Sequence, residues 1–225
     1  MDEVLEQLKR GVRHFQTEVY PRLAEIFAQA ASEEQKPHTL FITCADSRVD
    51  PIAITNSGTG EVFVTRNIGN IVPAYGEMLG GVSAVIEFAV CSLNVRHIVI
   101  CGHTQCGAMH ALLEPALVAD MPTVTSWLVN AHAALHFAET HKDRATAIST
   151  DEGIIDVLTE QNVLLQMRHL KTHPSVALAM SKGKLTISGW IYCIGTGKVC
   201  VAEDGQHTFM PISLELPTSV PVHLL

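Results

Sequence analysis

The sequence of 225 residues has few basic residues, with 15 lysines and arginines against 23 aspartates and glutamates. The net charge of −8 excludes the basic surface that nucleic-acid binding requires. No apolar run approaches the length of about eighteen residues needed to span a membrane. The N-terminus, MDEVLEQLKRG, also lacks the basic start and apolar stretch of a signal peptide. We therefore expect a cytoplasmic protein with neither nucleic acid nor a membrane as a partner.

Cysteine is also scarce, with six residues in the whole chain. In a cytoplasmic protein this number indicates free thiols or metal ligands rather than a disulfide framework. Internal repeats, low-complexity segments and an obvious linker are all absent. The apolar content of 47% is ordinary for a globular protein. We predict a single domain, residues 1–225.

Short apolar runs that are rich in β-branched residues alternate with helical segments. Strands buried on both faces of a parallel sheet have this character, and the alternation predicts βαβ units. The expected fold class is α/β, with a mostly parallel central sheet, an antiparallel edge strand and flanking helices. We predict strands at 38–44, 61–67, 96–103 and 184–194, a hairpin partner at 198–204, and helices at 79–94, 123–140 and 151–173.

The N-terminal segment has an apolar residue at every third or fourth position, which is typical of an amphipathic helix. Pro21 is expected to interrupt this helix before a second helical stripe follows. The first stripe consists of Val4, Leu8, Val12, Phe15 and Val19.

The stretch CADSRVDP, residues 44–51, places Cys44, Asp46 and Arg48 at alternate positions directly after the first apolar run. Alternate residues of an extended chain point to the same face. A packed strand would carry valine there, and an exposed one lysine or threonine. A thiol, a carboxylate and a guanidinium in this arrangement indicate a reactive or metal-binding site.

A second stretch of this kind, CGHTQCGAM, contains His103 and Cys106 at the end of another predicted strand. Ligand sites in open α/β sheets lie beyond the carboxyl ends of the strands, so the two stretches can converge. Two thiolates and an imidazole are typical zinc ligands, and thiolates favour zinc over magnesium or calcium. We predict one Zn²⁺ per chain, bound by Cys44, His103 and Cys106, with Asp46 as a further candidate ligand.

The position of Asp46 distinguishes a catalytic zinc site from a structural one. A structural zinc is closed by four protein ligands, whereas a catalytic zinc keeps one position open. Arg48 can form a bidentate ion pair with the Asp46 carboxylate, which would hold it off the metal and leave that position for water. We expect this open arrangement. The alternative is a binding protein in which zinc is purely structural and Asp46 is its fourth ligand.

Six segments, in order along nearly the whole chain, resemble the β-class carbonic anhydrases. The resemblance implies a zinc enzyme that interconverts carbon dioxide and bicarbonate through zinc-bound hydroxide, with the Asp46–Arg48 dyad orienting the hydroxide. It also implies a homodimer or higher homo-oligomer with an N-terminal helical arm, residues 1–34, at the subunit interface. The segments are CADSRVDP, RNIGNIVP, GGVSAVIEFAV, HIVICGHTQCGAM, NVLLQMRHLKTHPSV and SGWIY.

The same resemblance implies four substrate-binding residues. Gln35 is expected to reach into the partner's site and to hydrogen-bond a substrate oxygen. Phe63 and Phe88 are expected to form an apolar wall, and Gly107 to offer a backbone N–H near the metal. Phe88 departs from the family, in which tyrosine often stands at this position, so a role for that hydroxyl in proton transfer is absent here.

One enzymatic alternative stays open at this level. Hydrolases of carbon disulfide or carbonyl sulfide share the fold and the zinc ligands. A restricted tunnel to the metal would favour that activity, and the sequence contains no signal that decides this point.

Overall fold

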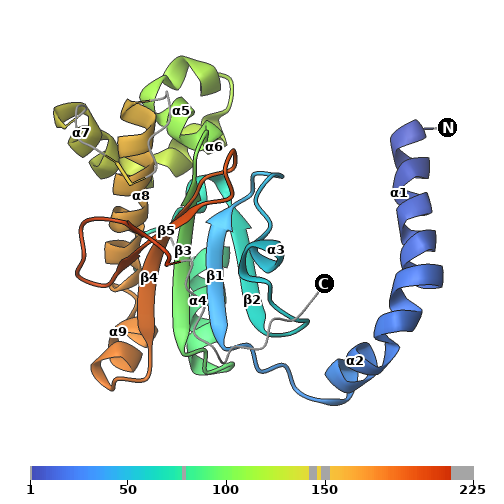
Figure 1. Ribbon diagram of the computed structural model, residues 1–225. Helices are drawn as coiled ribbons and strands as arrows, with labels where there is room; N and C mark the ends of the chain where they lie inside the picture. Colours follow the sequence, from blue (N-terminus) through green and yellow to red (C-terminus); the bar gives the residue numbers. More distant parts are fainter. Residues whose placement is uncertain (1, 78–79, 142–145, 148–152, 214–225) are drawn as a thin grey trace. The chain divides into compact units, whose positions relative to one another are not determined.

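The computed structural model describes residues 2–77, 80–141, 146–147 and 153–213. The chain forms two compact units that divide between Lys36 and Pro37. The first unit is helical and the second contains the sheet (Figure 1). Within the described ranges, no helix combines the length and the apolar character needed to cross a membrane.

The N-terminal unit is one nearly continuous helix. Helix α1 (Glu3–His14) leads through a π-helical turn (Phe15–Val19) into α2 (Tyr20–Ser32). The interruption predicted at Pro21 takes the form of this turn, because proline has no N–H and its ring crowds the carbonyl four residues earlier. The wider turn, closed by a hydrogen bond from the Tyr20 N–H to the Phe15 carbonyl, accommodates the proline without ending the helix.

The predicted apolar stripe of this unit is exposed. None of its described residues is buried within the chain, and the side chains of Leu8 and Val12 are 63% and 56% exposed. The rings of Tyr20 and Phe27 stack with a centroid separation of 5.4 Å, and Phe15 packs edge-on against both. The helix therefore presents a continuous apolar surface that its own unit does not cover.

The second unit is built on a sheet with the strand order β2-β1-β3-β4-β5-β6. The first four of these strands run parallel to one another, whereas β5 and β6 are antiparallel to their neighbours. This arrangement confirms the predicted fold class; the short β6 was not predicted, because two residues carry no alternating pattern. The strands are β1 (Thr39–Cys44), β2 (Val62–Asn67), β3 (His97–His103), β4 (Thr186–Tyr192), β5 (Val199–Glu203) and β6 (Met210–Pro211).

The helices of this unit correct three predictions. The helix predicted at 79–94 spans Gly81–Cys91, and residue 79 lies outside the described ranges. A 3₁₀ turn (Val129–Ala131) divides the helix predicted at 123–140, and the helix predicted at 151–173 ends at Leu170. Residues 151–152 of that prediction lie outside the described ranges. The helices are α3 (Pro51–Thr55), α4 (Gly81–Cys91), α5 (Gly107–Leu113), α6 (Pro122–Leu128), α7 (His132–Thr140), α8 (Ile154–Leu170) and α9 (Pro174–Ser181), with further 3₁₀ turns at Ile68–Asn70 and Pro115–Val118.

Helix α8 connects the two main parts of the core. Helices α4, α8 and α9 pack on one face of the sheet, while α5, α6 and α7 gather beyond the carboxyl ends of β1 and β3 (Figure 1). Two buried polar residues of α8 hold the loop that follows β2: Asn162 donates to the Gly69 carbonyl, and Gln166 accepts from the Val72 N–H, each at 2.9 Å. The helix thereby fixes a loop next to the strand ends.

Close packing of α8 against β4 leads to a stability prediction. We expect Gly189→Ala to lower the free energy of unfolding by about 1–3 kcal/mol, measurable by urea denaturation. The new Cβ would lie 2.6 Å from Cγ1 of Val163 and 2.7 Å from Sδ of Met167. Gly195→Ala is the matched control, because no atom lies within 4 Å of the position of its Cβ. Equal stability of the two variants would contradict this account of the packing.

Candidate active site

Three potential metal ligands meet at the carboxyl edge of the sheet. Cys44 ends β1, His103 ends the neighbouring parallel strand β3, and Cys106 precedes α5. One ligand atom of each lies within 4.8 Å of the others, and all three residues are buried. The two sulfur atoms are 4.0 Å apart. The parallel pairing of β1 with β3 thus brings together residues that lie far apart in the sequence.

This group fits zinc in both geometry and chemistry. Two sulfur atoms, each about 2.3 Å from a tetrahedral zinc ion, are about 3.8 Å apart, close to the observed separation. Nδ1 of His103 lies 2.8 Å from the Thr104 carbonyl, and a hydrogen bond to that carbonyl places the proton on Nδ1. Nε2 of His103 is buried and has no hydrogen-bond partner. A buried, unpaired nitrogen beside two sulfurs is what a metal ligand requires.

The two thiols affect the pKa of each other, so that one loses its proton more readily than the other. A hydrogen bond with Cys106 lowers the pKa of Cys44, and His103 together with the backbone amides of Gly69 and Asp46 lowers it further against the opposing effect of burial. The same interaction with Cys44, together with burial, raises the pKa of Cys106. The hydrogen bond between the two sulfurs therefore favours ionisation of one thiol of the pair over ionisation of both.

The Asp46 carboxylate lies beside this group and is held by Arg48. Arg48 donates from Nε to Oδ1 at 3.0 Å and from Nη2 to Oδ2 at 2.8 Å, and its backbone N–H donates to Oδ1 at 2.9 Å. These contacts hold the pKa of the Asp46 carboxyl well below its usual value. Oδ2 of Asp46 is 3.9 Å from Nε2 of His103, so the carboxylate faces the metal group without belonging to it.

Arg66 also supports this segment, a role that was not predicted. Its Nε and Nη2 donate to the backbone carbonyls of Cys44 and Asp46. Arg66 lies on β2 opposite Thr43 of β1, so its side chain reaches the turn that carries the reactive residues. Only the register between the two strands reveals this contact.

The four residues expected to bind substrate occupy different places. Gly107 follows Cys106 directly at the start of α5, and no atom lies within 4 Å of the position of a Cβ there. The rings of Phe63 and Phe88 pack together at 6.1 Å. Phe63 pairs with Leu40, four residues before Cys44 along β1, which corresponds to about 13 Å. Within one chain this pair therefore does not flank the metal group, and Gln35 belongs to the N-terminal unit.

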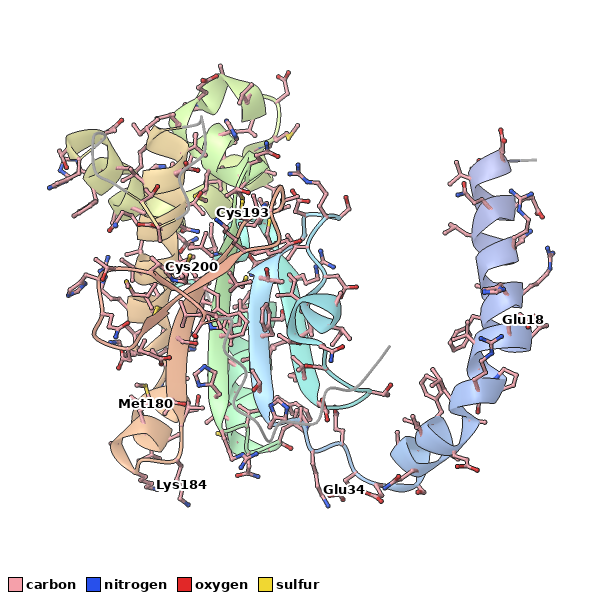
Figure 2. The ribbon with its side chains drawn as sticks, viewed as in Figure 1. Glu18, Glu34, Met180, Lys184, Cys193 and Cys200 are labelled. Carbon is pink, nitrogen blue, oxygen red and sulfur yellow. The ribbon has the colours of Figure 1, made fainter. Side chains whose placement is uncertain are left out.

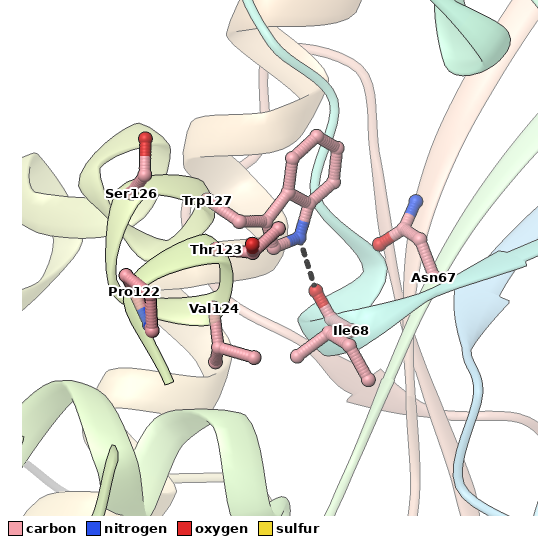
Figure 3. A pocket seen from close by; sticks show the side chains of 7 residues that line it. All are labelled: Asn67, Ile68, Pro122, Thr123, Val124, Ser126 and Trp127. Atoms are coloured by element: carbon pink, nitrogen blue, oxygen red, sulfur yellow. Dashed lines mark hydrogen bonds between the residues drawn. The ribbon is translucent and has the colours of Figure 1, made fainter. Parts of the chain in front are cut away.

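An apolar cavity of about 680 Å³ lies next to the site and was not predicted (Figure 3). Its wall includes Asn67, which is the register partner of Cys44, and Ile68. Trp127 of α6 also lines the cavity and donates from Nε1 to the Ile68 carbonyl at 2.8 Å (Figure 3). The lining formed by the described residues is mostly apolar and contains none of the three potential metal ligands.

The other cysteines lie apart from the metal group, and none of the six forms a disulfide. Burial raises the pKa of Cys101, on β3, to about 12. Cys193 and Cys200 lie on the hairpin of β4 and β5 (Figure 2), where both are buried in the core.

Comparison with known proteins agrees with this geometry. The family described as "Carbonic anhydrase" matches residues 39–199. A carbonic anhydrase from Synechococcus elongatus is 45% identical over 196 residues, covering 87% of this chain and 70% of that protein.

Two solved structures are similar as well. The β-carbonic anhydrase CcaA superposes with a TM-score of 0.87 at 34% identity, covering 96% of this chain and 95% of the other. One of two tetrameric β-carbonic anhydrases from Sordaria macrospora has a TM-score of 0.77 at 27% identity, covering 91% and 98%. By sequence, fold and site, the chain belongs to the β-class carbonic anhydrase family and is a carbon dioxide-hydrating enzyme.

Proposed function

We propose that Asp46, held in place by Arg48, is the catalytic carboxylate with which this enzyme hydrates carbon dioxide reversibly. The observation that supports this role is the position of its Oδ2, 3.9 Å from the unpaired Nε2 of His103 and bound by Nη2 of Arg48. A carboxylate in this position can act on a water molecule at the metal while remaining outside the metal group.

Each residue of the site has a defined part in this proposal. Cys44, His103 and Cys106 would hold one zinc ion. When bound, zinc supplies the nucleophile by lowering the pKa of water, which it brings to about 7 in the three-histidine carbonic anhydrases, the standard example. The ionised Asp46 accepts the hydrogen bond of the attacking oxygen and so directs its lone pair toward carbon dioxide. Arg48 prevents Asp46 from turning toward the metal ligands.

Stopped-flow hydration with a pH indicator tests this function, run from about pH 6.5 to about pH 9 on protein of measured zinc content. We expect about one zinc per chain and a rate that rises with pH. Two thiolates neutralise the charge of the zinc ion, so the rise should extend to more alkaline pH than in a three-histidine site. A flat profile would contradict the proposal. Stoichiometric zinc without hydration, but with sulfide release from carbonyl sulfide, would assign the sulfur-substrate activity instead.

We further propose that a second copy of the chain completes the site. The exposed stripe of the N-terminal helix and the half-buried ring of Phe63 are apolar surfaces that a neighbouring subunit can cover. Phe63 lies too far along β2 to line the metal group of its own chain, and Phe88 of α4 packs against it. In the proposed assembly this pair and Gln35 would instead line the metal site of the partner subunit. The tetrameric enzymes of Sordaria macrospora are consistent with such an assembly.

Charge on the stripe should disrupt this assembly. We expect Leu8→Glu combined with Val12→Glu to shift the protein toward monomers and to lower hydration activity, because two buried carboxylates would be desolvated without partners. Light scattering after size exclusion measures the mass. Arg10→Glu, on the opposite side of the helix, serves as the control and should remain oligomeric. An unchanged mass for the double variant would refute the role of the helical arm.

A further inference from the structure

Gln105 lies between two of the metal ligands and contacts Arg48 twice. Nη1 of Arg48 donates to the Gln105 side-chain oxygen, Oε1, and Nη2 donates to the Gln105 backbone carbonyl, both at 3.2 Å. We propose that Gln105 is a positioning residue, which holds the Arg48 guanidinium in the orientation that restrains Asp46. This inference rests on the proposed role of the Asp46–Arg48 pair.

The hydrogen bonds of Arg48 divide between its two neighbours. Nε and Nη2 face Asp46, whereas Nη1 and Nη2 face Gln105. The planar guanidinium offers five donors in a fixed arrangement, so fixing both edges fixes its plane. The Arg48 side chain is 45% exposed, so its outer part faces solvent. Gln105 thus links the turn after β1 to the turn after β3, 57 residues apart.

The backbone of Gln105 supports a functional reason for its side chain. Its φ angle is +58°, in the left-handed region, which is disfavoured for a residue other than glycine. The other described non-glycine residues with positive φ are Asn56, Asn70 and Asn94, and asparagine tolerates this region well. Glycine would adopt this φ angle with less strain, but it would lack the side chain that binds Arg48. Strain of this kind concentrates at functional sites.

The contact has a defined consequence for catalysis. Without Oε1, Arg48 loses the hydrogen bond from Nη1 to the Gln105 side chain and keeps the one from Nη2 to the Gln105 backbone carbonyl, so the plane of the guanidinium is held less firmly. Asp46 then has more freedom to turn toward the metal ligands. Since one hydrogen bond to a charged group is lost, we expect kcat to fall by about five- to twentyfold, with little change in KM.

Two substitutions separate the side-chain contact from the backbone strain. Gln105→Ala and Gln105→Gly both remove Oε1, but only glycine relieves the positive φ. We expect both variants to lose kcat by the same factor, whereas urea denaturation should find the glycine variant more stable than the alanine variant. If activity instead follows stability, so that Gln105→Gly retains full kcat, the role is only structural and the proposal is overturned.

A double-mutant cycle with Arg48→Ala tests whether Gln105 acts through Arg48. We expect Gln105→Gly to have almost no further effect on kcat once Arg48 is absent. The visible spectrum of the cobalt-substituted protein provides a readout that is independent of turnover, and it should change in the same direction in Arg48→Ala and Gln105→Gly. Fully additive losses in kcat would overturn the positioning role. If Arg48→Ala itself had no effect on kcat, the proposed role of the Asp46–Arg48 pair would be wrong, and this inference, which rests on that role, would be wrong as well.

Discussion

Replacement of Cys106 by alanine is expected to remove the bound zinc and to reduce carbon dioxide hydration by about a thousandfold or more. Cys106 is 1% exposed, and its Sγ lies 4.0 Å from that of Cys44. Only two protein ligands would remain, on neighbouring strand ends, and two ligands bind zinc far more weakly than three. Zinc analysis after dialysis and stopped-flow hydration measure the two effects.

Cys101→Ala is the matched control for this experiment. Cys101 is a fully buried thiol on the same strand as His103, but it does not belong to the metal group. Its removal should lower stability modestly, by about 1 kcal/mol for a small cavity, and leave zinc content and hydration unchanged. Circular dichroism would verify that both variants are folded. Stoichiometric zinc and full activity in Cys106→Ala would show that the ligand set is wrong.

The sheet was predictable because its strands are buried on both faces. Runs such as TLFITC and HIVICGH are nearly continuous apolar segments, and the structure places them side by side at the centre of the sheet. Each run ends at a reactive residue, so the parallel arrangement alone brings Cys44 and His103 to one edge. The ligand group therefore followed from strand direction and residue chemistry.

Helix α8 shows where pattern analysis fails. Its sequence alternates apolar with polar residues, including Glu160, Asn162 and Gln166, which would ordinarily mark an exposed face. In the structure these residues are buried. Glu160 accepts from the Ala147 N–H at 2.7 Å, and the two amides bind the loop after β2. A polar residue is buried when it satisfies backbone groups of another segment, and a single sequence contains no information on that pairing.

The contacts that support the site depend on the fold in the same way. Asp46 and Arg48 are close in sequence, so their ion pair was predictable from spacing. Arg66 lies near the site because β2 pairs with β1 in a particular register. Gln105 reaches Arg48 from a backbone turn with a positive φ angle. Neither feature appears in hydrophobic periodicity. The placement of Phe63 also depends on register, which separates it from the metal group of its own chain.

The second large effect is expected for Asp46→Asn, which should lower kcat by about a hundredfold to a thousandfold while zinc remains bound. Asparagine has nearly the same shape as aspartate, but it carries no charge, and its amide oxygen accepts a hydrogen bond more weakly than a carboxylate oxygen. It would keep at most one of the two bonds from the Arg48 side chain, since one carboxylate oxygen becomes an amide that donates. Because Asp46 does not belong to the metal group, the zinc content should stay at that of the unaltered enzyme.

The pH profile distinguishes orientation by Asp46 from titration of Asp46. Arg48 holds the pKa of this carboxyl well below its usual value, so it stays ionised throughout the pH range in which the rate rises. The residual activity of Asp46→Asn should therefore still rise with pH, although from a much lower plateau. A loss of the pH dependence itself would identify Asp46 as the titrating group and contradict its role as a permanently charged acceptor.

Asp50→Asn provides the control for loss of charge in the same turn. Asp50 caps α3 by accepting from the Ile52 N–H at 3.0 Å, and asparagine is an equally good N-cap residue. This variant should keep its stability, its zinc and its full hydration rate. If Asp46→Asn lost zinc as well as activity, Asp46 would be a metal ligand and Arg48 would not restrain it. Retention of both zinc and activity would show that a group other than Asp46 accepts the hydrogen bond of the attacking oxygen.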